Sequence, residues 1–180
     1  MDSKLKHVMV DLETLGTRPG DTILSIGAVK FSAEKGITEK FYVAIDSESC
    51  KEAGFRAQKS TLEWWSNQSE EARTAAFSGT LRIDLALIKF AMWMPPQDVA
   101  VVWGNGANFD NALLAAAYRL TKMDTPWHFW NDRCYRTIRA MFGTKEKKQN
   151  VGVPHNALDD ATTQALDLIE RAAACKFELR

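Results

Sequence analysis

Four carboxylates and one histidine, widely spaced along the chain, are the side chains best suited to chemistry. Asp11 and Glu13 lie in VMVDLET, Asp110 follows an apolar run and a glycine-rich break, and His155 and Asp160 lie in VPHNALDD. Carboxylate oxygens are the ligands that Mg²⁺ and Mn²⁺ prefer, and a cluster of them can hold two such ions. A histidine beside them can accept a proton from water near neutral pH. We therefore predict that the four carboxylates bind two divalent cations, Mg²⁺ or Mn²⁺, and that His155 is a general base.

The spacing of these residues sets what each element must do. On a β-strand alternate side chains share a face, so Asp11 and Glu13 would project together while Val10 and Leu12 point into the opposite layer. His155 and Asp160 are five positions apart, which is not a same-face spacing on a helix. The pair fits if Asp160 lies in the first turns of a helix and His155 lies just before it.

Each of these residues also has a plainer interpretation. The D-x-E pair could mark a strand edge that turns toward solvent. Asp110 could be an acid that stabilises the positive end of a helix dipole. His155 could be a buried structural residue. Asp159 is interpreted as an acid at a helix start, although a contribution beside Asp160 stays open.

The first part of the chain has the pattern of a β-meander. Apolar and β-branched residues predict strands over 8–14, 23–31 and 37–45, and short glycine-containing connections indicate antiparallel pairing. Helices are predicted next. Residues 60–63 (STLE) have a capping-box pattern with Ser60 at the helix start, before Trp64 and Trp65, and residues 69–72 (SEEA) predict another start. A further helix is expected over 81–94, ended by the two prolines that follow.

The second part alternates between strand and helix. The apolar run 99–103 (VAVVW) predicts a buried parallel strand, and Asn108 is predicted to cap a helix that runs to about Leu120. A short strand is predicted over 127–130, a helix over 132–142, a polar loop over 144–153 and a closing helix from Asn156 to about residue 174. The elements predict one α/β domain over residues 1–180. The loop lysines Lys145, Lys147 and Lys148 could bind phosphate or simply be solvated.

Composition limits the classes of function. The chain has 180 residues, 46% of them hydrophobic, which predicts a buried core. Its 23 basic and 23 acidic residues cancel, which argues against a protein that only coats nucleic acid. No apolar stretch approaches the roughly 18 residues of a membrane span, and the N-terminus does not resemble a signal peptide, so no membrane association is expected. The three cysteines form no C-x-x-C motif, and we expect reduced thiols in a cytoplasmic protein.

Together the motifs resemble those of the DEDDh 3′–5′ exonucleases, which have the ribonuclease-H-like fold and belong to the ribonuclease T/DNA polymerase III epsilon-like superfamily. The first family motif is similar to D-x-E-T-T-G, and residues 11–16 are DLETLG. The second is a loose N-x-x-F-D-like segment, here 105–110 (NGANFD), and the third is H-x4-D, here His155 and Asp160. Residues 59–69 (KSTLEWWSNQS) resemble a stretch of phage-type 3′–5′ exodeoxyribonucleases, and related mycobacterial exoribonucleases share the domain.

This resemblance covers nearly the whole chain and implies a fold and an activity. The fold would be a mixed sheet, a three-stranded antiparallel meander plus parallel strands, with helices on both faces. The activity would be metal-dependent hydrolysis from the 3′ end of single-stranded DNA or of a 3′ overhang, releasing nucleoside 5′-monophosphates. Thr14 and Leu15 would contact the terminal nucleotide, and Asn108 would also bind substrate. Trp64 or Trp65 could stack on a base, although either could instead be a core aromatic residue.

Other functions remain open at the level of sequence. An exoribonuclease that uses the same site is the nearest alternative, because contacts to a 2′-hydroxyl cannot be located in a sequence. A non-catalytic nucleic-acid-binding module is a second, and the presence of all five site residues argues against it. A structural interaction domain with exposed tryptophans would neither bind metal nor hydrolyse nucleic acid. The wider family leaves a homodimer open.

Overall fold

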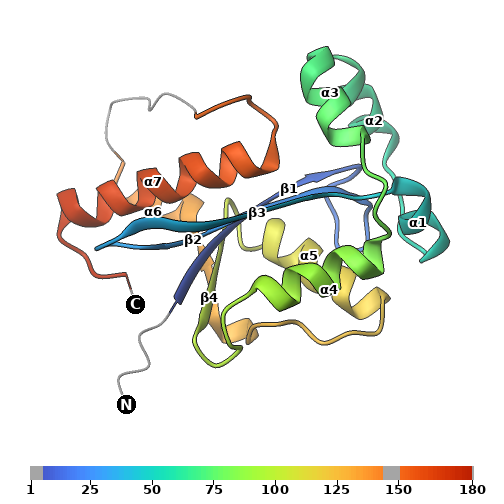
Figure 1. Ribbon diagram of the computed structural model, residues 1–180. Coiled ribbons are helices and arrows are strands. Elements are labelled where there is room, and N and C mark those ends of the chain that lie inside the picture. The colour runs from blue at the N-terminus through green and yellow to red at the C-terminus, as the bar shows by residue number, and fades with distance from the viewer. Residues whose placement is uncertain (1–5, 144–150, 180) are drawn as a thin grey trace.

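The structure, a computed structural model, describes residues 6–143 and 151–179 and is built on a five-stranded mixed sheet (Figure 1). The strands are β1 (Lys6–Thr14), β2 (Ile23–Ser32), β3 (Gly36–Ala44), β4 (Ala100–Gly104) and β5 (Asp132–Cys134). Their order is β3-β2-β1-β4-β5; the first three pair in antiparallel, and β4 pairs in parallel with both β1 and β5. The predicted meander and the predicted buried parallel strand are therefore confirmed.

Helices cover both faces of the sheet, as the resemblance implies (Figure 1). On one face lie α4 (Ile83–Trp93) and α5 (Asp110–Leu120), and on the other lie α6 (Tyr135–Met141) and α7 (Ala157–Cys175). Three shorter helices, α1 (Ser47–Glu52), α2 (Lys59–Ser66) and α3 (Glu70–Phe77), follow β3 and gather at one end of the sheet. None of the described helices has the length and the apolar character that crossing a bilayer requires.

The central strand β1 separates two hydrophobic cores by the alternation of its side chains. Val10 and Leu12 pack with residues of α4 and α5, whereas Met9 packs on the opposite face with residues of α7. Since alternate residues of a strand share a face, Asp11 and Glu13 continue the face of Met9. The acidic pair is therefore directed toward the layer of α7, and the predicted separation of the two faces is confirmed.

The starts of α3 and α7 agree with the sequence prediction. Ser69 Oγ accepts a hydrogen bond from the backbone nitrogen of Ala72 at 3.2 Å. Asn156 Oδ1 accepts from the backbone nitrogens of Leu158 and Asp159 at 3.1 and 3.2 Å. Such side chains satisfy N–H groups that have no partner inside the helix.

Two other predicted helix starts are wrong. α2 begins at Lys59 without a side-chain cap, so Ser60 lies inside the helix, and the carbonyl of Gln58 accepts the first backbone N–H groups. α5 has Phe109 rather than Asn108 in the capping position. There the carbonyl of Gly106 accepts from the backbone nitrogens of residues 109 and 110, so the turn closes without a side-chain cap.

The predicted strand over 127–130 is also wrong. Phe129–Asn131 form a 3₁₀ turn, and the edge strand β5 begins only at Asp132. The aromatic run misleads because Phe129 and Trp130 are exposed, and Trp127 alone of this run is buried. Its indole Nε1 donates to Asp132 Oδ1 at 2.8 Å. The predicted helix over 132–142 is correspondingly shortened to α6.

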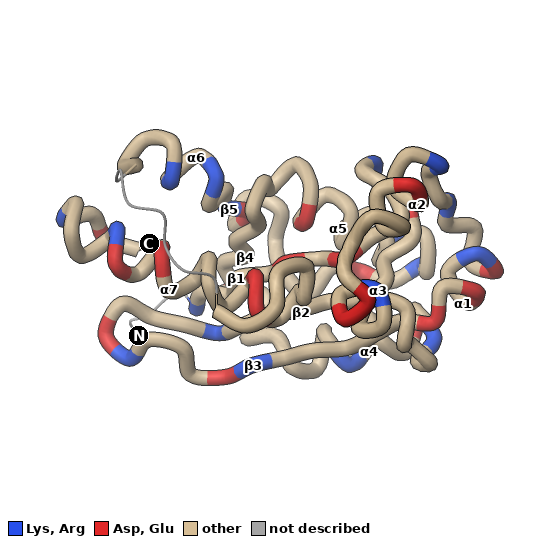
Figure 2. The backbone as a smooth tube through the Cα atoms, turned by 90° about the horizontal axis from the view of Figure 1, so that it is seen from above, with Lys and Arg blue, Asp and Glu red and all other residues tan. Residues whose placement is uncertain are grey.

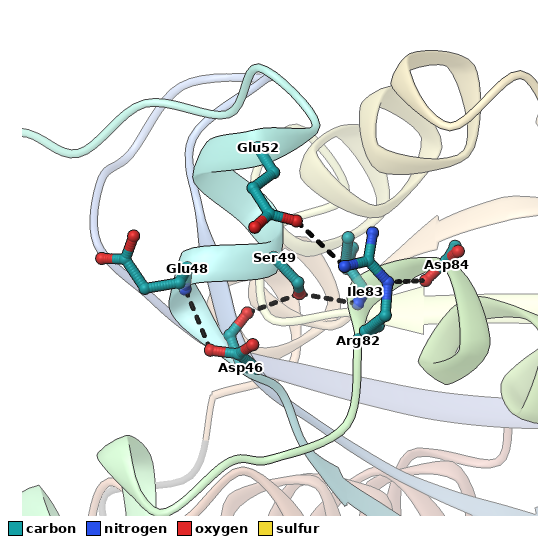
Figure 3. A network of polar contacts seen from close by, with 7 residues as sticks. All are labelled: Asp46, Glu48, Ser49, Glu52, Arg82, Ile83 and Asp84. Atoms are coloured by element: carbon teal, nitrogen blue, oxygen red, sulfur yellow. Dashed lines mark hydrogen bonds and ion pairs between the residues drawn. The ribbon is translucent and has the colours of Figure 1, made fainter.

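α1 is absent from the sequence prediction, because six residues are too few to show a helical period. Figure 3 shows the contacts that hold it. Ser49 Oγ donates to the carbonyl of Asp46 at 2.6 Å and accepts from the backbone nitrogen of Ile83 at 3.0 Å. The second contact joins α1 to the first residue of α4. The ion pairs of Arg82 beside it are exposed and contribute little to stability.

Candidate active site

β1 places the carboxylates of Asp11 and Glu13 on the face of the sheet that α7 covers. Asp11 Oδ1 accepts a hydrogen bond from Gln164 Nε2 at 2.6 Å. Glu13, two residues further along the same face, is buried. The contact with Gln164 joins residues 153 positions apart, so the start and the end of the described chain meet at this point.

A glycine allows α7 to approach the sheet closely enough for this contact. Gly27 of β2 pairs with Asp11 across the strands. A Cβ placed on Gly27 would lie only 2.1 Å from the backbone carbon of Ala157, the first residue of α7. Any other residue at position 27 would therefore push the start of α7 away from the acidic pair.

The start of α7 carries the third motif in the predicted arrangement. Asp160 lies in the first turns of the helix, and His155 directly precedes the capping residue Asn156. The backbone nitrogen of His155 donates to Asp160 Oδ2 at 3.1 Å. Donor atoms of Glu13, His155 and Asp160 all lie within 4.8 Å of one another. The spacing of five positions thus places both side chains beside the strand carboxylates.

Asp110, the first residue of α5, is the fourth carboxylate of this cluster. It is 2% exposed, and its Oδ1 accepts from the backbone nitrogen of Leu12 at 3.3 Å. Its Oδ2 is buried and has no hydrogen-bond partner among the described residues. A buried carboxylate oxygen without a donor is costly unless a cation satisfies it.

Burial and mutual repulsion shape the electrostatics of the cluster. Burial, followed by the charges of Asp160 and Asp110, raises the pKa of Glu13 to about 8. Burial, with the charges of Asp110 and Glu13 next, raises the pKa of Asp11 well above its ordinary value. Burial also raises the pKa values of Asp110 and Asp160. Carboxylates in this state resist ionisation unless a positive charge joins them, and hard oxygen donors of this kind suit Mg²⁺ or Mn²⁺.

Asp11, Glu13 and Asp160 line one pocket of about 690 Å³, whereas the buried Asp110 is outside its lining. Its lining includes Thr14, Trp64 and Trp65 of the predicted substrate-binding residues. Leu15 lies outside the lining and is buried in a small cluster with Leu24 and Trp65. Asn108 is exposed and also lies outside it. The structure therefore brings three of these five residues to the pocket.

The two tryptophans have different surroundings. Trp65 is 2% exposed, and its Nε1 donates to the carbonyl of Thr14 at 2.9 Å, which ties α2 to the end of β1. Trp64 is 41% exposed and meets the His155 ring edge-on, with centroids 4.9 Å apart and an interplanar angle of 89°. Trp65 is thus a core aromatic residue, and Trp64 is the one with a ring surface open to the pocket.

Sequence reasoning missed several residues of the pocket, and it left open the roles of Asp159 and of the loop lysines. Gln164 follows Asp160 by four positions on α7, a same-face spacing that could have indicated its contact with Asp11. Arg136 and Arg139 line the pocket from α6. Asp159 accepts from the backbone nitrogen of Val153 at 2.9 Å and so fastens the preceding loop. The loop lysines Lys145, Lys147 and Lys148 lie outside the described residues.

Comparison with known proteins identifies the family. Residues 6–169 match the family described as the 3′–5′ exoribonuclease Rv2179c-like domain. The exodeoxyribonuclease of Enterobacteria phage T4 is 26% identical over 156 residues, which cover 72% of this chain and 68% of the phage protein.

Solved structures share the fold at low sequence identity. The nuclease domain of 3′hExo, a DEDDh family member bound to rAMP, matches with a TM-score of 0.63 and 14% identity over 99% of this chain and 96% of that chain. E. coli exonuclease I in complex with a dT13 oligonucleotide matches with a TM-score of 0.67 and 15% identity over 96% of this chain. Cell-death related nuclease 4 (CRN-4) matches with a TM-score of 0.66 and 12% identity over the same share. The chain spans 43% of exonuclease I and 65% of CRN-4.

The family match includes every element that carries a site residue, from β1 to the first turns of α7. The class expected from the motifs, a 3′–5′ exonuclease, is confirmed. The expected fold is confirmed too, because the nuclease domain of 3′hExo, a DEDDh family member, shares it. This chain belongs to the family of Rv2179c-like 3′–5′ exoribonuclease domains.

Proposed function

We propose that this exonuclease acts on the 3′ end of single-stranded DNA or of a 3′ overhang and releases nucleoside 5′-monophosphates. The observation that carries the proposal is the convergence of Asp11, Glu13, Asp160 and His155 on one pocket, with the unpartnered Oδ2 of Asp110 behind them. The similarity to the phage T4 exodeoxyribonuclease supports DNA as the substrate.

RNA is the second candidate substrate, because the matched family is described as an exoribonuclease domain. Both substrates would use the same carboxylates and the same histidine. They differ by the 2′-hydroxyl, which can donate and accept hydrogen bonds in the pocket. A direct comparison of matched strands therefore decides between them.

The carboxylate cluster fits two divalent cations, Mg²⁺ or Mn²⁺. Asp11, Glu13, Asp110 and Asp160 would hold them, since each offers a hard oxygen donor in or beside the pocket. When bound, such ions supply activation of water and stabilisation of the leaving 3′ oxygen. The unpartnered Asp110 Oδ2 and the raised pKa of Glu13 both indicate acceptor capacity that cations would satisfy.

His155 would accept the proton of the attacking water. Its backbone nitrogen donates to Asp160, and its ring packs perpendicular to the ring of Trp64, so the imidazole is held beside the carboxylates. The lone pair of a neutral imidazole can accept the proton in this transfer.

Trp64 and Thr14 would position the terminal nucleotide. The exposed ring of Trp64 can stack on any base, which suits an enzyme that removes nucleotides in succession. Thr14 Oγ1 donates to the carbonyl of Gly16, so contact with substrate would come through the Thr14 backbone. Leu15 would have to leave its buried cluster to contact a nucleotide. Its role and that of Asn108 stay predictions.

Digestion of matched DNA and RNA oligonucleotides tests the function directly. Strands labelled at either end would be incubated with Mg²⁺, with Mn²⁺ or with EDTA. We expect stepwise loss of 5′-monophosphates from the 3′ end, faster on DNA, and no reaction in EDTA. Products from the 5′ end, or activity that survives EDTA, would contradict the proposal. Faster digestion of RNA would favour the second candidate.

Calorimetric titration with Mn²⁺ tests the cation-binding assignment separately. Asp11→Asn and Glu13→Gln keep the shape of the side chains and remove a ligand charge, so both should weaken Mn²⁺ binding and abolish hydrolysis. Asp124→Asn is the matched control, because Asp124 is an exposed acid outside the pocket. Mn²⁺ binding that is unchanged in both pocket variants would rule out the assignment.

A further inference from the structure

Two arginines of α6 face the pocket and have no part in the chemistry described above. Arg136 and Arg139 both belong to the pocket lining. They are three positions apart, which places them on one face of the helix. α6 contains these two basic residues and no acidic residue (Figure 2).

Neither arginine is used to stabilise the fold within the described part of the chain. Both are exposed, and neither side chain forms an ion pair or hydrogen bond with another residue in ranges 6–143 and 151–179, although the positive charge of Arg136 acts on the nearby Asp110 carboxylate. Arg171 of α7 shows the contrast. It is buried, forms an ion pair with Asp167 and donates to the carbonyl of Phe142 at 2.7 Å.

The helix that carries the two arginines is nevertheless held firmly. The hydroxyl of Tyr135 donates to Asp167 Oδ2 at 2.6 Å, and the bond from Arg171 to Phe142 fixes the other end of α6 to α7. Arg136 lies over the glycine break that precedes Asp110, because a Cβ added to Gly106 would be 3.8 Å from Arg136 Cζ. Arg139 follows one turn later, about 4.5 Å further along the helix axis.

The charge of the carboxylate cluster explains why arginines would be needed in the pocket lining. Four ionised carboxylates offset the charge of two divalent cations, so the loaded centre has little net charge to attract a strand beyond the bond being cut. Each further nucleotide adds a phosphate, and affinity for single strands depends mainly on neutralising phosphates. Arg136 and Arg139 are the two arginines of the pocket lining.

We propose that Arg136 and Arg139 form a phosphate-binding site for the part of the strand on the 5′ side of the terminal nucleotide. Arginine suits this role, because its guanidinium fork matches the geometry of phosphate oxygens. The site would recognise the backbone and not the base, so it would serve DNA and RNA alike. The assignment rests on the proposed function, since it places the bond being cut at the carboxylates.

Binding without catalysis is the first test. A 5′-fluorescein-labelled strand of ten thymidines is titrated with protein in EDTA at several low NaCl concentrations, with anisotropy as the readout. Arg136→Gln and Arg139→Gln should each lower affinity about tenfold, the loss of one charged hydrogen bond. Each should also reduce the slope of log affinity against log salt by about 0.7. Equal affinities and slopes in wild type and variants, or no binding by any of them, would overturn the proposal.

Arg119→Gln is the matched control for this test. Arg119 is also an exposed arginine in the last turn of a helix, α5, but it lies outside the pocket. Its loss removes the same favourable interaction with a helix end that Arg139 makes. If Arg119→Gln changes the affinity as much as the pocket variants do, the effect comes from overall charge. That result would contradict the proposed phosphate-binding site.

The second test distinguishes an effect on the binding of upstream phosphates from an effect on hydrolysis itself. The p-nitrophenyl ester of thymidine 5′-monophosphate contains one cleavable phosphodiester and no phosphate upstream of it. With Mn²⁺, the ratio of kcat/KM on the strand to kcat/KM on the ester should fall about tenfold in either variant. An unchanged ratio would overturn the assignment to the upstream strand. Failure of the proposed function looks different, because the wild type would then cleave neither substrate while the arginine-dependent binding persists.

Discussion

His155 has a backbone conformation that side chains other than glycine seldom adopt, with φ of 62°. The left-handed region costs an ordinary residue about 1–2 kcal/mol. The hydrogen bond from its backbone nitrogen to Asp160 and the ring contact with Trp64 offset this strain. Strain at a residue directed into a pocket of carboxylates agrees with a chemical role for the imidazole.

Replacing the imidazole tests that role. His155→Ala should lower the single-turnover rate about 10²- to 10⁴-fold, the usual contribution of a positioned acid or base. The affinity of this variant for Mn²⁺ should change far less than in Asp11→Asn.

The measurement is single-turnover hydrolysis of a labelled oligonucleotide in the presence of Mn²⁺. His128→Ala is the control, because His128 lies outside the pocket and pairs with Asp98. A His155→Ala variant with near-parental rates would exclude the general-base role.

The neighbouring tryptophans should respond differently to substitution. Trp64→Ala should weaken strand binding by about 1–3 kcal/mol, the range for base stacking on an aromatic ring, with little loss of stability. Trp65→Ala should lower the free energy of unfolding by about 3–5 kcal/mol, because a buried indole and its hydrogen bond to Thr14 are lost. Anisotropy with a labelled strand in EDTA and urea unfolding measure the two effects. Equal destabilisation by both variants would contradict the assignment.

At the scale of elements, the site depends on how closely α7 approaches the sheet. Gly27 leaves room for the backbone of α7 directly opposite Asp11. The obstructing atoms belong to the backbone of Ala157, so a smaller side chain on α7 would not relieve a clash. One methyl group on β2 can therefore separate the carboxylates of β1 from Asp160 and His155.

Gly27→Ala should accordingly remove most nuclease activity, even where the protein stays folded. Gly36→Ala is the comparison, since open space surrounds that position and only its φ of 67° is unfavourable. It should lower stability by about 1–2 kcal/mol and keep activity. Urea unfolding and digestion assays on both variants give the result. Full activity in Gly27→Ala would show that the close approach of α7 is not required.

The elements also show where local sequence patterns predict the structure and where they fail. The alternation of Val10, Asp11, Leu12 and Glu13 predicts both faces of β1, because one face is apolar and the other acidic. The capping prediction at α2 fails because tertiary contacts act there: Gln58 Nε2 donates to Asp21 Oδ2 at 2.5 Å, across 37 positions of sequence. The aromatic run at 127–130 fails because its exposed members have no core to fill.

The residues of the site also divide into those that the sequence predicts and those that only the fold brings to the site. Asp11, Glu13, Asp160 and His155 can be found from short motifs, because each motif encodes its own strand or helix start. The role of Gly27 cannot, since it follows from the packing of β2 against a helix 130 positions later. Arg136 and Arg139 show only a spacing in the sequence, and their place in the pocket follows from the docking of α6 on α7.

At the scale of the whole molecule, the acidic cluster makes the stability of the metal-free protein depend on pH. The pKa of Glu13 rises from 4.5 to about 8, so between these values the folded protein binds more protons than the unfolded chain. The free energy of unfolding therefore falls as pH rises through this window. We expect urea unfolding in EDTA to give the highest value near pH 5 and a steady decrease toward pH 8.

Saturating Mn²⁺ should oppose that decrease, because the cation binds the ionised, folded cluster. Glu13→Gln should make the decrease in EDTA less steep, since one of the titrating carboxyl groups is removed. A free energy of unfolding that increases from pH 5 to pH 8 in EDTA would show that the cluster does not destabilise the metal-free fold in this way.

The contact between Asp11 and Gln164 has a consequence for how the protein becomes active during synthesis. It joins residues 153 positions apart, so the site closes only after nearly all the described chain has left the ribosome. Contacts of such long range form late, because a long loop must be ordered before they contribute. A nascent chain that already contains Asp11, Glu13 and Asp110 would thus lack nuclease activity until α7 docks. Recovery of activity on refolding should therefore coincide with the slowest folding phase and never precede it.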